Sequence, residues 1–170
     1  THRLGGDWKL NLQNMPRGSA TKPPRLRESL LARLGCNVVK ADASQIEARF
    51  VAAFCEQKEL IHRVETGEDV YSSLASKIFG WKVTKANVPE RFIGKTAQLG
   101  CGFGVGGEKF AKTVRMDSRK YTGTMIEMDT PEGDRVVRVY RAENYMVPIM
   151  WNRLNQEIPE MTREGCSIKI

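Results

Sequence analysis

Residues 88–104 read VPERFIGKTAQLGCGFG, and this stretch has the spacing of an α-helix. Pro89 suits the first turn, because a proline there lacks only an N–H that would have no partner within the helix. Residues 90–101 continue with helical periodicity. Four side chains, each four positions apart, lie along one face of this helix: Arg91, Lys95, Leu99 and Phe103.

The charge on this helical face is unusual, because two cations occupy its N-terminal part. The N-terminal end of a helix dipole is positive, so Arg91 and Lys95 add to that potential. The arrangement is costly unless an anion binds there, and a triphosphate is a suitable anion. Leu99 and Phe103 would supply apolar contact for a flat group further along the face. A solvated face, on which Glu90 reduces the repulsion, is the alternative.

The composition favours a polyanionic partner. The 170 residues include 27 Lys and Arg against 20 Asp and Glu, which gives a formal net charge of +7. Residues 1–27 are rich in cations and suit either a solvated loop or an arm that follows a nucleic-acid backbone. No apolar run approaches the roughly 18 residues of a membrane span. The four scattered cysteines are typical of reduced thiols. We therefore expect a soluble, cytoplasmic protein with no membrane partner.

The chain as a whole is predicted to be helix-rich with a few strands, an α+β fold. Residues 37–41 form a short apolar run that suits a buried strand, and Asp42 follows it. Ser44 and Glu47 have the spacing of a capping box for a helix over 45–54. Further helices are expected over 57–64, 70–79, 107–115 and 136–158, with Pro148 interrupting the last, and the segment 125–128 could form a strand.

Three sequence blocks together resemble the family A DNA polymerases, the class of bacterial DNA polymerase I and of many phage replicases. Residues 1–4 (THRL) and 11–16 (NLQNMP) resemble that family's T-G-R-L and N-L-Q-N-I-P segments. Residues 42–49 (DASQIEAR) resemble its motif A, D-Y-S-Q-I-E-L-R. Residues 91–104 resemble its motif B, R-x3-K-x3-F/Y-G-x2-Y-G. Residues 139–151 also resemble a later helix of phage members, which favours a viral origin.

This resemblance implies a role for each matching residue. Asp42 would hold two catalytic Mg²⁺ ions together with the backbone carbonyl of Ala43. Arg91 and Lys95 would act as catalytic residues that bind the phosphates of the incoming dNTP. Glu47 would exclude a ribose 2′-hydroxyl. The other implied substrate contacts are Gln45, Leu99, Phe103 and Tyr71, and the implied DNA contacts are Arg3, Gln13, Asn14 and Gly104.

The resemblance also implies a partial polymerase palm, with few antiparallel strands, and a helical fingers subdomain. Residues 1–55 would be the N-terminal part of the palm, and residues 56–165 the fingers, with the motif B helix at about 90–104. Residues 166–170 would begin a returning palm strand. The implied activity is template-directed DNA synthesis from dNTPs on primer–template DNA. A processivity factor or an exonuclease domain could accompany it in the full-length protein.

Several residues depart from the family pattern. Ala43 stands where Tyr is usual, Leu99 where Phe or Tyr is usual, and Phe103 where Tyr is usual. Tyr71 occupies the position of a phosphate-contacting His in many members. No His-Asp pair occurs to supply the second palm carboxylate, so we expect a fragment that cannot polymerise alone. A non-catalytic nucleic-acid-binding remnant of the same fold and an NTP-hydrolysing enzyme are the alternatives.

Overall fold

The computed structural model describes residues 29–39, 41 and 43–164, with side chains described up to residue 159. Contacts divide the chain into two units, Thr1–Ala43 and Ser44–Ile170. The described residues of the first unit contain no strand, and the side chains of Val38 and Val39 are 62% and 88% exposed. A buried strand needs partners for its backbone N–H and C=O groups. The strand expected over 37–41 is therefore wrong for the residues that are described.

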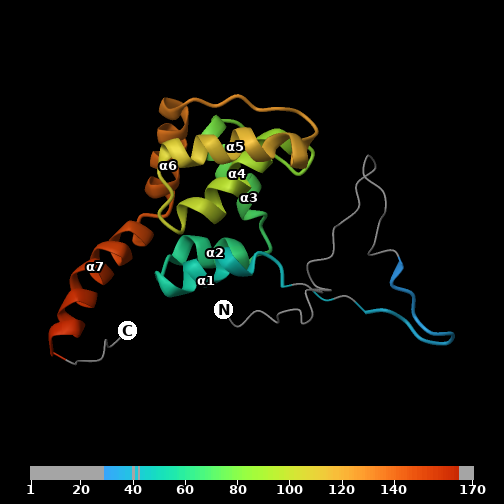
Figure 1. The fold of residues 1–170 in the computed structure, drawn as a ribbon, viewed down its shortest axis with the longest axis horizontal. Helices are drawn as coiled ribbons and strands as arrows, with labels where there is room; N and C mark the ends of the chain where they lie inside the picture. Colours follow the sequence, from blue (N-terminus) through green and yellow to red (C-terminus); the bar gives the residue numbers. More distant parts are fainter. Residues whose placement is uncertain (1–28, 40, 42, 165–170) are drawn as a thin grey trace. The chain divides into compact units, whose positions relative to one another are not determined.

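The second unit is built from helices, and its described residues contain no strand (Figure 1). The helices are α1 (Ile46–Phe54), α2 (Lys58–Glu65), α3 (Val70–Phe79), α4 (Val88–Cys101), α5 (Gly107–Thr122), α6 (Thr130–Glu143) and α7 (Met146–Glu164). The expectation of an α+β fold with a palm of antiparallel strands is thus wrong for the described residues. Their apolar side chains recur at helical spacing and are buried between helices, which leaves no two-residue alternation to form a sheet.

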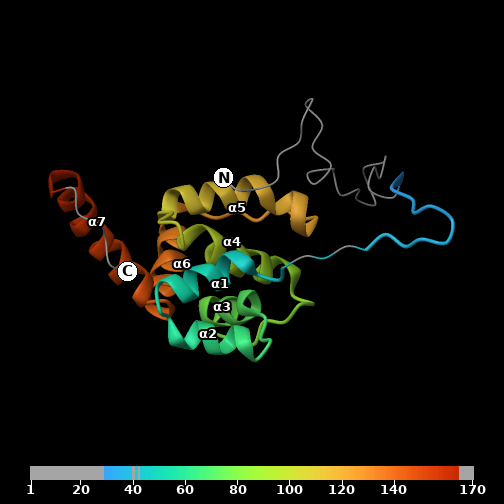
Figure 2. The ribbon, with the colours of Figure 1, turned by 90° about the horizontal axis from the view of Figure 1, so that it is seen from below.

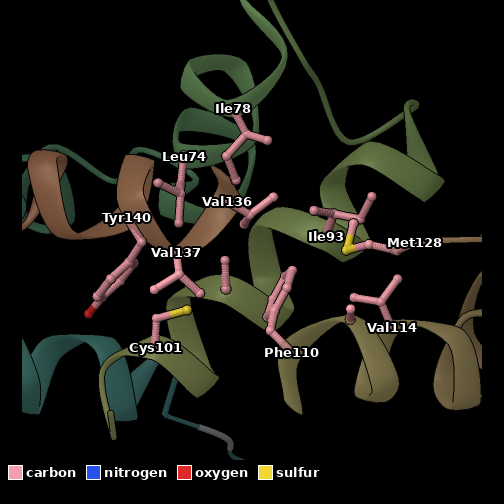
Figure 3. Close-up of a cluster of buried hydrophobic side chains, with 12 residues drawn as sticks. Leu74, Ile78, Ile93, Cys101, Phe110, Val114, Met128, Val136, Val137 and Tyr140 are labelled. Atoms are coloured by element: carbon pink, nitrogen blue, oxygen red, sulfur yellow. The ribbon is translucent and has the colours of Figure 1, made fainter. Parts of the chain in front are cut away.

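The main core lies between α3, α4, α5 and α6. Figure 3 shows side chains from all four helices meeting there, with Ile93 and Phe110 from α4 and α5 and Val136 from α6. Met128, in the irregular segment before α6, closes one end of this core. Fully burying an apolar side chain stabilises a fold by about 1.5–3 kcal/mol, so this cluster is the main source of stability for the unit.

The helices α3 and α4 approach each other closely in this core. A Cβ atom at Gly94 would overlap the carbonyl oxygen of Tyr71 and would lie 2.8 Å from the Cβ of Ala75. Only glycine leaves room for the two backbones at this distance. The contact fixes α4, which carries the two cations, against the beginning and middle of α3.

A second buried cluster joins α1 to the start of α7. Val51 on α1 and Cys55, the C-cap of that helix, pack with Val147 on α7, and Trp151 packs against this cluster. Figures 1 and 2 agree that the far part of α7 extends away from the other helices. No helix among the described residues is both long and apolar enough to cross a lipid bilayer.

Helix boundaries correct three expectations. Gln45, with φ 56° and ψ 30°, is the N-cap of α1 and makes no side-chain capping bond, so the capping box that was expected at Ser44 is wrong. The segment 125–128 is irregular and not a strand. The break expected at Pro148 lies at residues 144–145 instead, because a proline is tolerated in the first turn of the following helix.

Candidate functional site

The helix α4 begins at a turn held by side-chain hydrogen bonds. The Asn87 Oδ1 atom accepts hydrogen bonds from the backbone N–H and the hydroxyl of Thr84, each at 2.9 Å. Asn87 is the N-cap of the helix, and Pro89 lies in its first turn as the sequence predicts. These contacts fix where the helix starts, and therefore the direction in which its side chains point.

Three of the four predicted residues on this helix line one cavity of about 510 Å³ between α4 and α5. The predicted residues in its wall are Arg91, Lys95 and Leu99. The other lining residues are Lys85, Val88, Phe92, Thr96, Gly100, Thr113, Asp117 and Tyr121. Three cations therefore border a single cavity, and one carboxylate, that of Asp117, faces it from α5. The Phe92 and Tyr121 rings stack with their centroids 5.7 Å apart and give the cavity an aromatic wall.

Arg91 is held in place by the start of α3. Its Nε donates a hydrogen bond to Asp69 Oδ2 at 2.7 Å, and its Nη2 donates another to Asp69 Oδ1 at 3.2 Å. The hydroxyl of Ser72 donates a further bond to Asp69 Oδ2 at 2.8 Å. The guanidinium carbon also lies 5.4 Å from the centre of the Tyr71 ring, which is a cation–π contact.

Burial alone would raise the pKa of the Asp69 carboxyl, but its partners reverse that effect. Hydrogen bonds from Arg91 and Ser72, together with the charge of Arg91, lower this pKa below its ordinary value. The Asp69 side chain is 13% exposed and that of Arg91 is 28% exposed. The pair is partly shielded from water, and both groups are charged at neutral pH.

Tyr71 connects the cationic helix to α1. Burial raises the pKa of the Tyr71 phenol, and the negative charge of Glu47 on α1 raises it further. Leu99 packs against a buried cluster that contains Ala48 of α1 and Tyr71 of α3. The structure therefore packs α1, the helix that carries Glu47, against Tyr71 and Leu99.

Phe103 and Gly104 lie beyond the end of α4. Phe103 is 67% exposed and is not among the residues that line the cavity. Gly104 has φ 79°, a backbone conformation that L side chains rarely adopt, so a glycine is needed there. Because α4 ends at Cys101, the expectation that Phe103 continues the helix face of Arg91, Lys95 and Leu99 is wrong, and the structure does not bring the Phe103 ring to the cavity.

Four of the remaining predicted residues have no described position. Asp42, Arg3, Gln13 and Asn14 lie outside the described residues. Ala43 is exposed, and Gln45 is the half-buried N-cap of α1. In the part of the chain that is described, no group of three His, Cys, Asp or Glu side chains could hold a metal ion.

Most of the other residues at the site were not identified from the sequence, among them Asp69 and Lys85. Asp69 directly precedes the expected helix over 70–79, and an Asp at that position ordinarily indicates only a helix cap. Lys85 lies in the turn before α4, and no sequence motif indicated that it lines the cavity. The signal that could have found Asp69 is its position two residues before Tyr71, which was predicted to contact substrate.

Comparison with known sequences shows which family has this pattern. Residues 6–128 match the family described as DNA polymerase family A, and this range contains both α1 and α4. The chain belongs to the family A DNA polymerases. The chain is 34% identical to DNA polymerase I of Chloroflexus aurantiacus over 96 residues, 56% of this chain and 10% of the relative.

Two further relatives have the same description. DNA polymerase I of Synechocystis is 34% identical over 103 residues, 60% of this chain and 10% of the relative. DNA polymerase I of Rhizobium leguminosarum is 29% identical over 168 residues, 94% of this chain and 16% of the relative. The chain thus spans between a tenth and a sixth of the length of these curated relatives.

Proposed function

We propose that this chain supplies the nucleotide-binding helix of a template-directed DNA polymerase, which joins dNTPs to a primer on template DNA. The observation that carries the proposal is the cavity beside α4, which Arg91, Lys95 and Leu99 line at the four-residue spacing of the motif that this segment resembles. Membership of the family supports the same conclusion. The net charge of +7 suits primer–template DNA as a partner.

The proposed roles follow from the chemistry of the side chains. Arg91 presents a planar guanidinium, which makes directional hydrogen bonds to phosphate oxygens, whereas Lys95 acts as a mobile point charge. Both add to the positive end of the helix dipole, so negative charge that develops on a triphosphate is stabilised there. Leu99 would contact the nucleotide through its apolar surface. Phosphoryl transfer depends mainly on such positioning and charge stabilisation.

Sugar selection and metal binding are further parts of the proposal. Glu47 would exclude a ribose 2′-hydroxyl, and the charge that it places near Tyr71 supports that location. Mg²⁺ ions, with Asp42 and the Ala43 carbonyl as ligands, would stabilise the attacking and leaving oxygens when bound. The roles proposed for Arg91 and Lys95 do not depend on the position of these ions.

The proposal is tested by comparing nucleotide binding with DNA binding. Affinity for dATP is measured by calorimetry, and affinity for a primer–template duplex by fluorescence anisotropy. Lys95→Ala should weaken dATP binding about tenfold or more, as expected for loss of a charge-assisted contact, and change DNA affinity by less than about threefold. The matched control is Lys112→Ala, an exposed lysine on α5 outside the cavity, which should leave dATP binding unchanged. Equal loss of both affinities in Lys95→Ala would contradict the assigned role.

We also expect that these 170 residues do not extend a primer without a further carboxylate. The sequence has no His-Asp pair to complete the set that two-metal catalysis needs. A primer-extension assay with Mg²⁺ and all four dNTPs should give no product, while a complete DNA polymerase I in the same buffer gives full extension. Template-dependent extension by the chain alone would refute this expectation.

A further inference from the structure

The start of α3 forms a rigid support for one face of the Arg91 guanidinium. Asp69 accepts hydrogen bonds from Arg91 Nε and Nη2, at 2.7 and 3.2 Å, so the two groups meet side by side. A paired contact of this kind fixes the plane of a guanidinium as well as its position. The Tyr71 ring, 5.4 Å from the guanidinium carbon, limits movement in another direction.

Asp69 at the start of α3 is itself held in place. The Ser72 hydroxyl donates to the same Oδ2 atom that accepts from Arg91 Nε, and Asp69 is the N-cap residue of α3. The absence of a Cβ at Gly94 lets α3 and α4 approach closely, so the distance between Asp69 and Arg91 is set by packed backbone. Asp69 therefore cannot follow Arg91 if the guanidinium rotates away.

The contact leaves part of Arg91 available for an anion. Asp69 uses Nε and Nη2, whereas no hydrogen bond within the described residues uses Nη1. Arg91 also lines the cavity. A carboxylate beside an anion site repels the anion, so its presence is costly unless the orientation that it gives to Arg91 outweighs the repulsion.

We propose that Asp69 is a positioning residue, which orients Arg91 so that Nη1 faces the triphosphate of the bound nucleotide. This inference rests on the proposed function of α4. Asp69 and Ser72 lie outside the three sequence blocks, and they would contribute to nucleotide binding by orienting Arg91. Without Asp69, Arg91 would keep its charge but would sample several rotamers, and ordering it on binding would cost free energy.

The test is a double-mutant cycle with inorganic triphosphate and dATP as probes. Asp69→Asn keeps the shape of the side chain and removes its charge. It should weaken binding of both probes about fivefold in the wild-type background and less than twofold in an Arg91→Ala background. Glu132→Gln, which breaks a similar two-bond pair with Arg135 on α6, is the matched control and should change neither affinity.

Three results of the cycle would overturn the inference. They are tighter binding in Asp69→Asn, an unchanged affinity, and the same loss in both backgrounds. The last of these would mean that Asp69 acts on the fold and not through Arg91. If Asp69→Asn does not fold by circular dichroism, Ser72→Ala replaces it in the cycle, with a smaller loss expected in the same direction.

A second measurement separates this inference from the proposed function. The Arg91 Nε–H signal, assigned by its disappearance in Arg91→Lys, should exchange slowly with solvent in the wild-type chain and quickly in Asp69→Asn. Equal exchange rates would refute the positioning role, whether or not nucleotide binds. Slow exchange in a chain that binds no triphosphate would instead refute the proposed function of α4 and leave the Asp69–Arg91 pair as a structural contact.

Discussion

Asp69 and Arg91 form a partly shielded ion pair, and its strength should depend on pH. The pKa of the Asp69 carboxyl is lowered in the folded chain, so the pair contributes stability above the ordinary carboxyl pKa. That contribution is lost as the pH falls through the lowered pKa, because the carboxyl is then protonated in both states. Between neutral pH and about pH 5 it should stay constant.

This dependence can be measured by urea unfolding of the wild type and Asp69→Asn from pH 7 to pH 3. At neutral pH the variant should be less stable by about 1–3 kcal/mol, the cost expected for a hydrogen bond to a charged group. The difference should shrink below about pH 4. A difference that grows as the pH falls would show that the direction assigned to this pKa is wrong.

Side chains that share a face of one helix could be predicted from the sequence. The four-residue spacing of Arg91, Lys95 and Leu99 predicts a shared face, and the structure places all three in one cavity wall. The partner of Arg91 could not be predicted in this way. Asp69 lies 22 residues away, and their contact depends on how α3 packs against α4, which no local pattern specifies.

Among the elements, α3 and α4 require a small residue where they meet. A Cβ at Gly94 would overlap the backbone of Tyr71. That backbone is part of a helix, so displacing it would cost free energy. Gly94→Ala should therefore lower the free energy of unfolding by about 2–3 kcal/mol, within the range for an overpacked core. To accommodate the extra methyl group, α3 and α4 would have to move apart. Because this movement would separate Tyr71 from Arg91, the substitution should also weaken dATP binding.

Gly100→Ala is the matched control on the same helix. A Cβ there would lie 3.6 Å from Val105 Cγ2, which is an ordinary van der Waals contact. Alanine is the better helix former by about 0.5–1 kcal/mol, so this variant should be as stable as the wild type or more so. Thermal unfolding of both variants checks the pair. If Gly94→Ala is as stable as Gly100→Ala, helix propensity, and not the close approach at Gly94, sets the result.

Helices were predicted more accurately than other elements. The expected helix over 70–79 is confirmed with its end at Gly80, whose φ of 75° suits a glycine cap. α5 continues to Thr122, seven residues beyond its expected end, because its basic last turn reaches a glycine cap only at Gly123. The strand expected over 37–41 was wrong for the described residues, since an apolar run alone cannot supply a pairing partner.

For the whole molecule, the family was identified correctly from three separated blocks, whereas the fold class was not. The motifs determine the family because each needs particular side chains at fixed positions. The antiparallel palm was inferred from the resemblance and not from any alternating pattern in this chain. The described residues are helical, and the predicted metal ligand Asp42 lies outside them.

Nucleotide binding by α4 is tested by a titration of the ¹⁵N-labelled chain with dATP, followed by NMR. The largest chemical-shift changes should fall on α4 between Arg91 and Leu99, on the Arg91 Nε–H, and on Tyr71. Lys95→Ala should reduce the affinity measured from these shifts about tenfold. Shifts confined to other helices, or none at millimolar dATP, would contradict the claim that α4 binds the nucleotide.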